Sequence, residues 1–480
     1  MDAFYAAVEV HDDPTLAGRP LIVGGNGPRG VVASCSYEAR AFGVRSAMPS
    51  AQARRLCPRA VFLAGHYDRY AEVSRAIHRI FEAYTPLVEG IALDEAFLDV
   101  SGAIRLFGPT AKIADGIRAQ IGEELGLSCS VGVAASKFVA KLASEAAKPH
   151  AALAGTVPGL GVVVVAPGEE LAFLHPLPVE ALWGVGPATA TRLRRLGVGT
   201  VGQLAAVPIA ALEASVGRAH GHHLHQLAHA VDPRRVSPDR VTKSVGHEET
   251  WAYDRYDATE MHAAAVRMAD AVASRLRKSG FVGRTVTLKV RFGDFTMITR
   301  SHTLPRPADT GAALARVATG LLERVDCSPG VRLLGVSVSS LAGPAGVGSE
   351  QLAFDIEDPT GAASGPSASG PPPSRPPPSG PPASRASAAG PLAPRPSAPR
   401  PSPSECAEAW RAATGAMDEA RRRFGEAAVG PAAAMGEPGL PLGRPGGNRW
   451  GPAARDDDAR RSDPHGARAG ADHRARPAAD

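Results

Sequence analysis

The segment Leu93-Asp94-Glu95-Ala96-Phe97-Leu98-Asp99-Val100 places two adjacent carboxylates inside an apolar stretch. An unpaired buried charge is very costly, so a strand that carries two acids needs a chemical reason for them. Successive side chains of an ideal strand point to opposite faces, so both carboxylates reach one ion only at a β-bulge or a strand end. The segment predicts either a hard-metal site of the Mg²⁺ type, which takes carboxylate and phosphate oxygens, or a strand end with solvated acids.

Strand and helix patterns alternate around this segment. Apolar residues every three to four positions predict a helix over 67–84, and glycine-bounded β-type runs predict short strands. The predicted strands are 19–24, 30–34, 91–100 and 128–133, and the predicted helices are 67–84, 110–124 and 137–147. Short helices with glycine turns follow from about 176 to 231, and 243–341 is again mixed. The fold class expected is α+β, with helices on one face of a sheet.

Length and composition limit the possible classes of protein. The 480 residues suggest about three domains. The net charge of +5 weakly favours a polyanionic partner. Five scattered cysteines without a CxxC pair argue against a disulfide framework or a zinc ribbon. No apolar run approaches about 18 residues and no basic, apolar leader opens the chain, so we expect a cytoplasmic protein without membrane contact.

The C-terminal quarter has a different composition. Residues 359–404 contain 16 prolines among Ser, Gly and Ala, with no acid, which predicts a disordered, semi-extended linker. Helical character returns over 406–428, around Trp410, Met417 and Phe424. Residues 451–480 are charged and almost without apolar side chains, which predicts a disordered tail.

Two further segments supply groups that bind phosphate. Tyr37-Glu38-Ala39-Arg40 precedes Phe42-Gly43-Val44-Arg45, and Ser136-Lys137-Phe138-Val139-Ala140-Lys141 leads to Lys148-Pro149. A carboxylate pair, an arginine fork, a tyrosine hydroxyl and a lysine together suit the transfer of a phosphoryl group from a triphosphate. Each basic residue taken alone is more simply a solvated helix face.

These segments resemble the Y-family translesion DNA polymerases, and within them the bacterial DNA polymerase IV (DinB) branch, in its actinobacterial form. The similarity covers about residues 1–345 in order. It is carried by MDAFYAAVEV, YEARAFGVRSAMP, LDEAFLDVSG, SVGVAASKFVAKLASEAAKP, LWGVGPATATRLRRLG and VRLLGVSVSSL.

The resemblance implies a right-hand polymerase fold with an added little-finger domain. The units would be palm (1–3 and 66–172), fingers (4–65), thumb (173–234), little finger (241–345), clamp-binding peptide (346–358), linker (359–404), small helical extension (405–450) and tail (451–480). The implied activity is error-prone, DNA-directed DNA synthesis past lesions, without proofreading. The enzyme is expected to be a monomer, and its implied partners are primer–template DNA, deoxynucleoside triphosphates and the sliding clamp (beta subunit).

The resemblance also implies roles for individual residues. Asp94 would bind metal, and Glu95 would be the catalytic acidic residue and a second ligand of two Mg²⁺ ions. Tyr37, Arg40 and Lys148 would hold the incoming triphosphate. Tyr5 would be the steric gate under the sugar, with Phe4 packed beside it; the alternative for both rings is an ordinary core position.

One departure from the family pattern concerns the N-terminus. The family carries a metal-binding aspartate immediately before the residue aligned with Met1, and the chain as written begins after it. On an N-terminal strand Asp2 would point to the same face about 6.6–6.8 Å further along, which makes it a poor substitute. A start site assigned too late at an internal methionine explains the difference most simply. The other hypothesis is a catalytically impaired scaffold that binds DNA and clamp.

DNA contacts are predicted in two later segments. Gly184 and Gly186 open a helix in a helix–hairpin–helix pattern, whose backbone amides can hold a phosphate without reading sequence. In Thr285–Phe292 and 334–339, apolar residues alternate with polar ones, so one sheet face is core and the other basic and hydroxylic. A helix with Met261, Met268 and Leu276 would cover the apolar face and end near Gly280. The predicted DNA-binding side chains are Lys243, Lys289, Arg291, Arg300 and Arg332.

Two motifs remain beside these. Gln351, Leu352 and Phe354 resemble the short peptides by which bacterial polymerases hold the sliding clamp. The histidines from His220 to His229 lack a metalloprotease spacing or a nearby cysteine, so we assign no metal to them. A third hypothesis, a purely structural DNA-binding protein of the helix–hairpin–helix type, leaves the LDEAFLD and YEAR segments unexplained.

Overall fold

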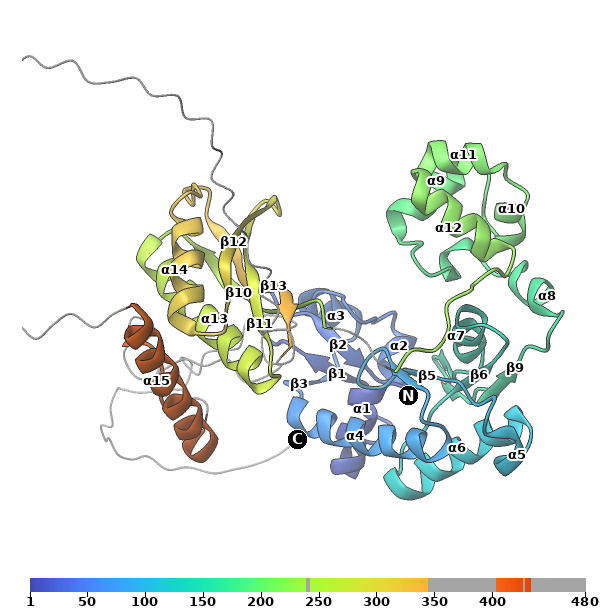
Figure 1. The fold of residues 1–480 in the computed structure, drawn as a ribbon. Coiled ribbons are helices and arrows are strands. Elements are labelled where there is room, and N and C mark those ends of the chain that lie inside the picture. Colours follow the sequence, from blue (N-terminus) through green and yellow to red (C-terminus); the bar gives the residue numbers. More distant parts are fainter. Residues whose placement is uncertain (239–241, 344–402, 426–427, 433–480) are drawn as a thin grey trace, which may run out of the picture.

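Four buried apolar clusters organise the computed structural model, which describes residues 1–238, 242–343, 403–425 and 428–432. Figure 1 shows the α8–α12 helices as one lobe and the β10–β13 unit as another, with the N-terminal elements between them. The predicted clamp peptide (346–358), the tail (451–480), residues 359–402 of the linker, and residues 426–427 and 433–450 of the extension lie outside the described residues. None of the described helices is long and apolar enough to cross a membrane.

The first cluster lies among helices α1 (Phe4–Asp12), α4 (Tyr67–Tyr84) and α6 (Thr110–Leu125). The helix predicted over 67–84 is confirmed to the residue, and its predicted apolar stripe is buried. The predicted single sheet is not formed here. Instead β4 (Val88–Gly90) pairs with β5 (Ala96–Leu98), and β6 (Val131–Val133) pairs in parallel with β9 (Val162–Val164). Short α5 (Ile104–Phe107) and the 3₁₀ turn η1 (Pro14–Leu16) complete this part.

A three-stranded sheet separates this cluster from a second one. Its order is β2 (Val32–Cys35), β1 (Leu21–Gly24), β3 (Val61–Leu63), and α2 (Tyr37–Ala41) and α3 (Ser50–Leu56) flank it. Leu21 and Val23 pack into the α1–α4 cluster, whereas Ile22 packs into the other. Alternate residues of a strand point to opposite faces, so β1 is buried on both sides and joins the two cores.

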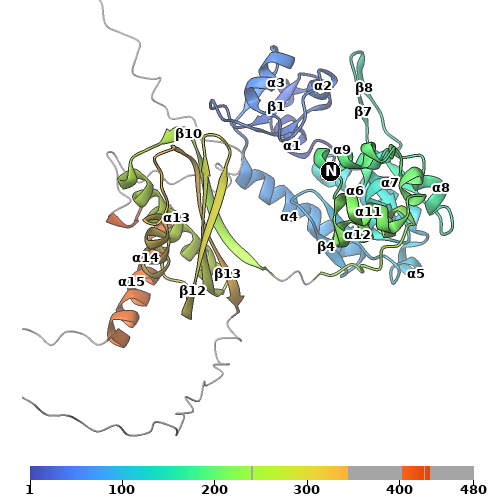
Figure 2. The same cartoon turned by 90° about the horizontal axis from the view of Figure 1, so that it is seen from above.

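The third cluster is helical. It is formed by α8 (Glu170–Leu174), the 3₁₀ turn η2 (Val179–Ala181), α9 (Pro187–Arg195), α10 (Val201–Ala205), α11 (Ile209–Val216) and α12 (Arg218–Ala228). Phe138 and Val139 of α7 (Lys137–Ala146) belong to the same cluster. The hairpin β7 (His150–Ala152)–β8 (Gly155–Val157) projects beyond it (Figure 2).

The fourth cluster fills one face of a sheet ordered β10 (Ser244–Arg255), β13 (Val331–Ala342), β11 (Val282–Phe292), β12 (Met297–Ala308). Helices α13 (Ala258–Lys278) and α14 (Gly311–Leu322) cover that face. The predicted alternation is confirmed, because Val286, Leu288 and Val290 are buried. The covering helix is also as predicted, and Gly280 at φ 67° lies just beyond its end.

A last helix, α15 (Pro403–Phe424), lies beside α13 and α14 in both views (Figures 1 and 2). The sequence predicted a helix over 406–428, so its type is confirmed and its bounds are shifted toward the N-terminus. Its position against α13 was not predicted.

Candidate active site

Asp94 and Glu95 lie in the loop that joins β4 to β5. The amides of Ile91 and Ala92 both donate to the Glu95 carbonyl oxygen, at 2.8 and 3.2 Å, and close this loop tightly. The strand predicted over 91–100 was therefore wrong over its first half, since only Ala96–Leu98 is strand. Because the two acids are in a turn at a strand end, alternation no longer forces them apart.

The two carboxylates have opposite pKa shifts. Burial, the largest influence, raises the pKa of Asp94 against the opposing charge of the N-terminal ammonium. Burial would also raise the pKa of Glu95. A 2.9 Å hydrogen bond from Lys141 Nζ to Oε2 and the charge of Lys148 outweigh burial, so the pKa of Glu95 is lowered overall. A partly buried, negatively charged pair beside cationic side chains is the arrangement expected of a ligand-binding centre.

Residues 1–3 pass beside this pair, but not as a strand. The Met1 ammonium donates to the Asp94 carbonyl oxygen at 2.8 Å, and the Asp2 amide donates to Ser128 O at 3.1 Å. Ala3, at φ 47°, turns the chain into α1. The predicted strand placement of Asp2 was therefore wrong: its buried carboxylate accepts from Ser130 Oγ at 2.8 Å.

Tyr37 begins α2, which Ser36 caps by accepting the amide of Ala39. The Tyr37 hydroxyl is buried and has no hydrogen-bond partner within the described residues. Burial, with the charge of Asp2, raises the pKa of Tyr37 to about 12, so the hydroxyl keeps its proton at neutral pH. The guanidinium of Arg40 lies 4.6 Å from the centre of the Tyr37 ring. A protonated buried hydroxyl without an acceptor fits an anionic ligand such as a phosphate.

Helix α7 brings lysines to the carboxylate pair. The helix packs so closely on β6 that a Cβ on Gly132 would lie only 2.0 Å from the Ala140 carbonyl oxygen. Lys141 binds Glu95, and Lys137 binds Glu89 of β4 at 2.7 Å. Lys141 was not among the predicted site residues, although its spacing of four from Lys137 places both on one helix face. At the end of the helix Lys148 Nζ pairs with Glu145 at 2.5 Å.

Tyr5 and Phe4 lie at the start of α1, not on a strand. Phe4 is 3% exposed within the core, whereas Tyr5 is half-buried at its edge. The Tyr5 ring stacks on Tyr70 of α4, with Tyr67 edge-on at 5.8 Å. Phe4 is therefore a core aromatic, and Tyr5 retains one side toward solvent.

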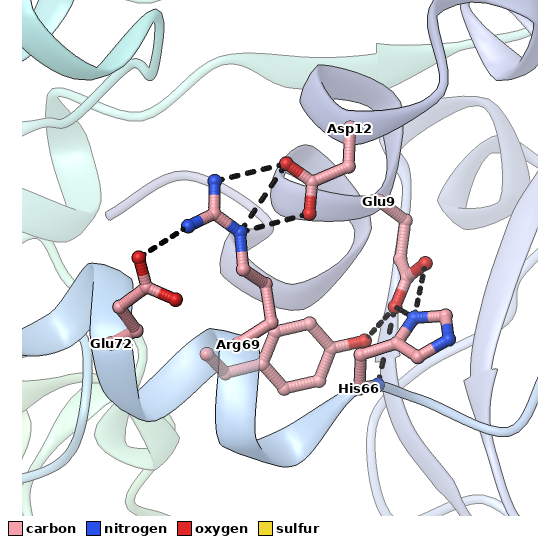
Figure 3. Close-up of polar contacts among 6 residues, drawn as sticks. Glu9, Asp12, His66, Arg69 and Glu72 are labelled. Atoms are coloured by element: carbon pink, nitrogen blue, oxygen red, sulfur yellow. Dashed lines mark hydrogen bonds and ion pairs between the residues drawn. The ribbon is translucent and has the colours of Figure 1, made fainter.

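A polar cluster that is buried at Glu9 and Tyr70 and reaches the surface at its other members joins α1 to α4 (Figure 3). Glu9 accepts hydrogen bonds from the Tyr70 hydroxyl and, at 3.3 Å, from the His66 amide. One turn further, Arg69 binds Asp12 through two nitrogens and also binds Glu72. The sequence did not indicate these partners, because the α1 and α4 members are 57 or more residues apart.

The predicted DNA-binding residues lie on two other units. Gly184, at φ 95°, and Gly186 form an exposed turn that leads into α9, while Val185 between them is buried. On the open face of the β10–β13 sheet, Thr285 and Thr287 form hydroxyl ladders with Thr303 and Ser301. These are the exposed helix start and the polar sheet face that the sequence predicted.

Charge on this sheet face is partly neutralised. Lys289 binds Glu248 at 2.8 Å across β13. Gly335 of β13 leaves room for this pair, because a Cβ added there would lie 2.8 Å from the Cβ of Glu248. Arg332 lies 4.4 Å over the ring of Phe295, and Arg300 and Lys243 are exposed. The nitrogen Nε of Arg291 is buried without a partner among the described residues.

No group of three or more His, Cys, Asp or Glu side chains that could hold a metal occurs within the described ranges. Asp94 and Glu95 contribute two adjacent carboxylates. Their carboxylates are the ligand type that Mg²⁺ prefers, so the pair fits part of a metal site.

Three family profiles match separate segments of this chain. Residues 1–145 match the impB/mucB/samB family, and 242–354 match the C-terminal domain of that family. Residues 180–232 match the thumb domain of DNA polymerase iota.

Individual relatives cover the same region. DNA polymerase IV of Streptomyces coelicolor is 48% identical over 345 residues, which are 71% of this chain and 70% of the relative. DNA polymerase IV of Halorhodospira halophila is 46% identical over 71% of this chain and 93% of its own. Among solved structures, a chimera of the Y-family DNA polymerases Dbh and Dpo4 has a TM-score of 0.63 at 25% identity, covering 71% of this chain and 96% of its own.

Proposed function

Because this chain belongs to the impB/mucB/samB family, that of the Y-family DNA polymerases, we propose that the Asp94–Glu95 loop is the centre of its nucleotidyl transfer. The protein is a DNA-directed DNA polymerase of translesion synthesis that acts on DNA and deoxynucleoside triphosphates. Its reaction joins the primer 3′ oxygen to the α-phosphorus of the nucleotide and releases pyrophosphate.

One observation supports this site most strongly: the Tyr37 hydroxyl is buried without an acceptor among the described residues, within electrostatic reach of Asp2 and of Glu145, the present partner of Lys148. Tyr37 would donate to a phosphate oxygen, and Arg40 and Lys148 would neutralise the triphosphate. Lys148 would exchange its partner Glu145 for phosphate. These are the hydrogen-bonding and charge contacts that phosphoryl transfer requires.

Asp94 and Glu95 would be ligands of Mg²⁺, and the proposed reaction uses two such ions. Bound Mg²⁺ would lower the pKa of the primer hydroxyl and stabilise the charge of the leaving pyrophosphate. Lys141 would keep the carboxylate of Glu95 ionised before metal binds, because its hydrogen bond lowers the pKa of that carboxyl.

Two surfaces would hold the duplex. The Gly184–Gly186 turn would donate backbone amides to phosphates, and Lys243, Lys289, Arg291, Arg300 and Arg332 would contact the backbone across the open sheet face. These two units would be the thumb and the little finger, with palm and fingers formed by the N-terminal clusters. We also propose that the protein is a monomer and binds a sliding clamp through Gln351, Leu352 and Phe354, which lie outside the described residues.

The sharpest test of the site compares two acid-to-alanine variants. Glu95→Ala should lower single-turnover primer extension by at least about a hundredfold, because it removes a metal ligand and a catalytic charge. The control Glu123→Ala removes an exposed acid of α6 and should extend at the unaltered rate. DNA affinity should stay within about twofold in both, since phosphate contacts on other units dominate it. Rapid extension by Glu95→Ala would refute the assignment; DNA binding by the unaltered chain without any extension would favour the scaffold.

A further inference from the structure

The C-terminal helix α15 contacts α13 through interlocked charges. Arg277 of α13 donates to Asp418 of α15 from two nitrogens, at 2.6 and 2.9 Å. In return Arg421 of α15 binds Asp270 of α13 at 2.5 Å. Each helix therefore contributes one acid and one base, and each charge finds its opposite on the other helix. We call these four residues the docking cluster.

The docking cluster is built into the surrounding structure. Asp270 and Arg421 are only 6% and 4% exposed, and a buried charge without its partner is strongly destabilising. The Nε of Arg421 also donates to Val429 O at 3.0 Å, so the residues after the helix return onto it. Arg277 additionally holds the Asp309 carbonyl at 2.6 Å, directly before α14.

Space for the cluster is provided on the body of the domain. Gly311, the first residue of α14, lies so close to Asp270 that a Cβ there would be 2.8 Å from Oδ1. Asp270, Ser274 and Arg277 follow at spacings of four and three, which places them on one face of α13. Ser274 is also buried and approaches Asp418 at 3.5 Å.

The contact is polar in character. Among the α15 residues whose side chains are described (409, 410 and 412–424), only Thr414 and Arg421 are buried, while Trp410 and Phe424 are exposed. Desolvation offsets much of the attraction between buried ions, so such a contact is specific but weak. The family profiles end at residue 354, before α15 begins.

We propose that α15 is an intramolecular docking helix, which binds reversibly to the α13 face of the sheet domain through the docking cluster. The helix occupies the side of α13 and α14 away from the open sheet face (Figures 1 and 2), so docking leaves the proposed DNA surface free. It also returns the chain after residue 402 to the domain that it left after residue 343.

Hydrogen exchange of the full chain tests this proposal. Most helical stability in proteins comes from tertiary packing, so docking should slow exchange of the 409–424 amides by at least about tenfold. Asp418→Asn and Arg421→Gln should abolish that protection. Both substitutions are on α15, so the sequence of the β10–β13 sheet domain stays unaltered in these variants.

The matched control is Glu419→Gln, which removes the adjacent exposed acid of the same helix and should keep the protection. Primer extension and DNA affinity should stay unchanged in every variant. Equal protection in Asp418→Asn and the unaltered chain would overturn the proposal, as would free exchange in the unaltered chain. Protection that increases with protein concentration would also overturn it, because the helix would then dock on a second copy.

Discussion

The ring of Tyr5 stacks on the ring of Tyr70, with centroids 4.3 Å apart and planes 13° from parallel. The Tyr70 hydroxyl in turn binds Glu9, which lies on the same helix as Tyr5. Helix α4 therefore holds α1 by both a ring contact and a buried hydrogen bond. If Tyr5 is the steric gate, Tyr70 is the residue that positions it.

Removing the Tyr5 ring should admit ribonucleotides. A close-packed aromatic wall has no spare volume for a 2′-hydroxyl, so its loss removes discrimination without adding attraction. We expect Tyr5→Ala to raise ribonucleotide use relative to deoxynucleotide use at least about tenfold, or ~1.4 kcal/mol. The measurement is kcat/KM for a matched nucleotide pair. An unchanged ratio with both rates reduced would make Tyr5 an ordinary core aromatic.

Two substitutions of Tyr70 separate its ring from its hydroxyl. Tyr70→Ala should lower sugar discrimination several-fold, because Tyr5 loses its stacking partner. Tyr70→Phe keeps the ring and should hold the ratio within about twofold. The loss of one hydrogen bond to Glu9, which keeps its contacts with His66, should lower the free energy of unfolding by about 1–3 kcal/mol. Steady-state kinetics and chemical denaturation give the two readouts. Equal discrimination in both variants would contradict the positioning role.

A residue placed before Met1 should lie at the carboxylate pair. The Met1 nitrogen is 2.8 Å from the Asp94 carbonyl oxygen, so a preceding residue begins beside the proposed metal site. Adding an aspartate there should raise the single-turnover rate by at least about tenfold, because a third carboxylate strengthens Mg²⁺ binding. Alanine at the same position is the control. Equal rates for the two extended chains would show that the added carboxylate is not a ligand.

Asp232 should stabilise the site helix in a pH-dependent way. Its buried carboxylate accepts from the amide of Phe138 at the start of α7 and from Arg234. Burial would raise the pKa of Asp232, but these hydrogen bonds outweigh it and lower the pKa below 3.8. The stabilisation is therefore complete above about pH 3.8, the unfolded value, and is lost as pH falls through the lower folded value.

Asp232→Asn tests that dependence. The variant should lose about 1–3 kcal/mol at pH 7, and its deficit in Tm should shrink as the pH is lowered below 4. Asp115→Asn, at an exposed position of α6, is the control. A deficit that stays constant with pH would mean that the carboxylate charge contributes nothing.

Local sequence alone determined much of this structure. The stripe of apolar residues in 67–84 and the alternation in Thr285–Phe292 predicted elements whose burial the structure confirms. Both patterns show which side of one helix or strand faces the core, and this depends only on the periodicity of that element. The paired acids at 94 and 95 likewise indicated the proposed site, because burying two charges requires a partner.

Tertiary structure alone decided which residues meet. Glu95 finds Lys141 across 46 residues, and Asp270 finds Arg421 across 151. It also turned the predicted strand at 91–95 into a loop and moved Asp2 to Ser130. The periodicity of one element does not predict such pairs, because many acidic and basic side chains elsewhere in the chain could form them equally well. The packing of the elements decides which of these pairs form, and it depends on close contacts such as that of Gly132 in β6 with α7.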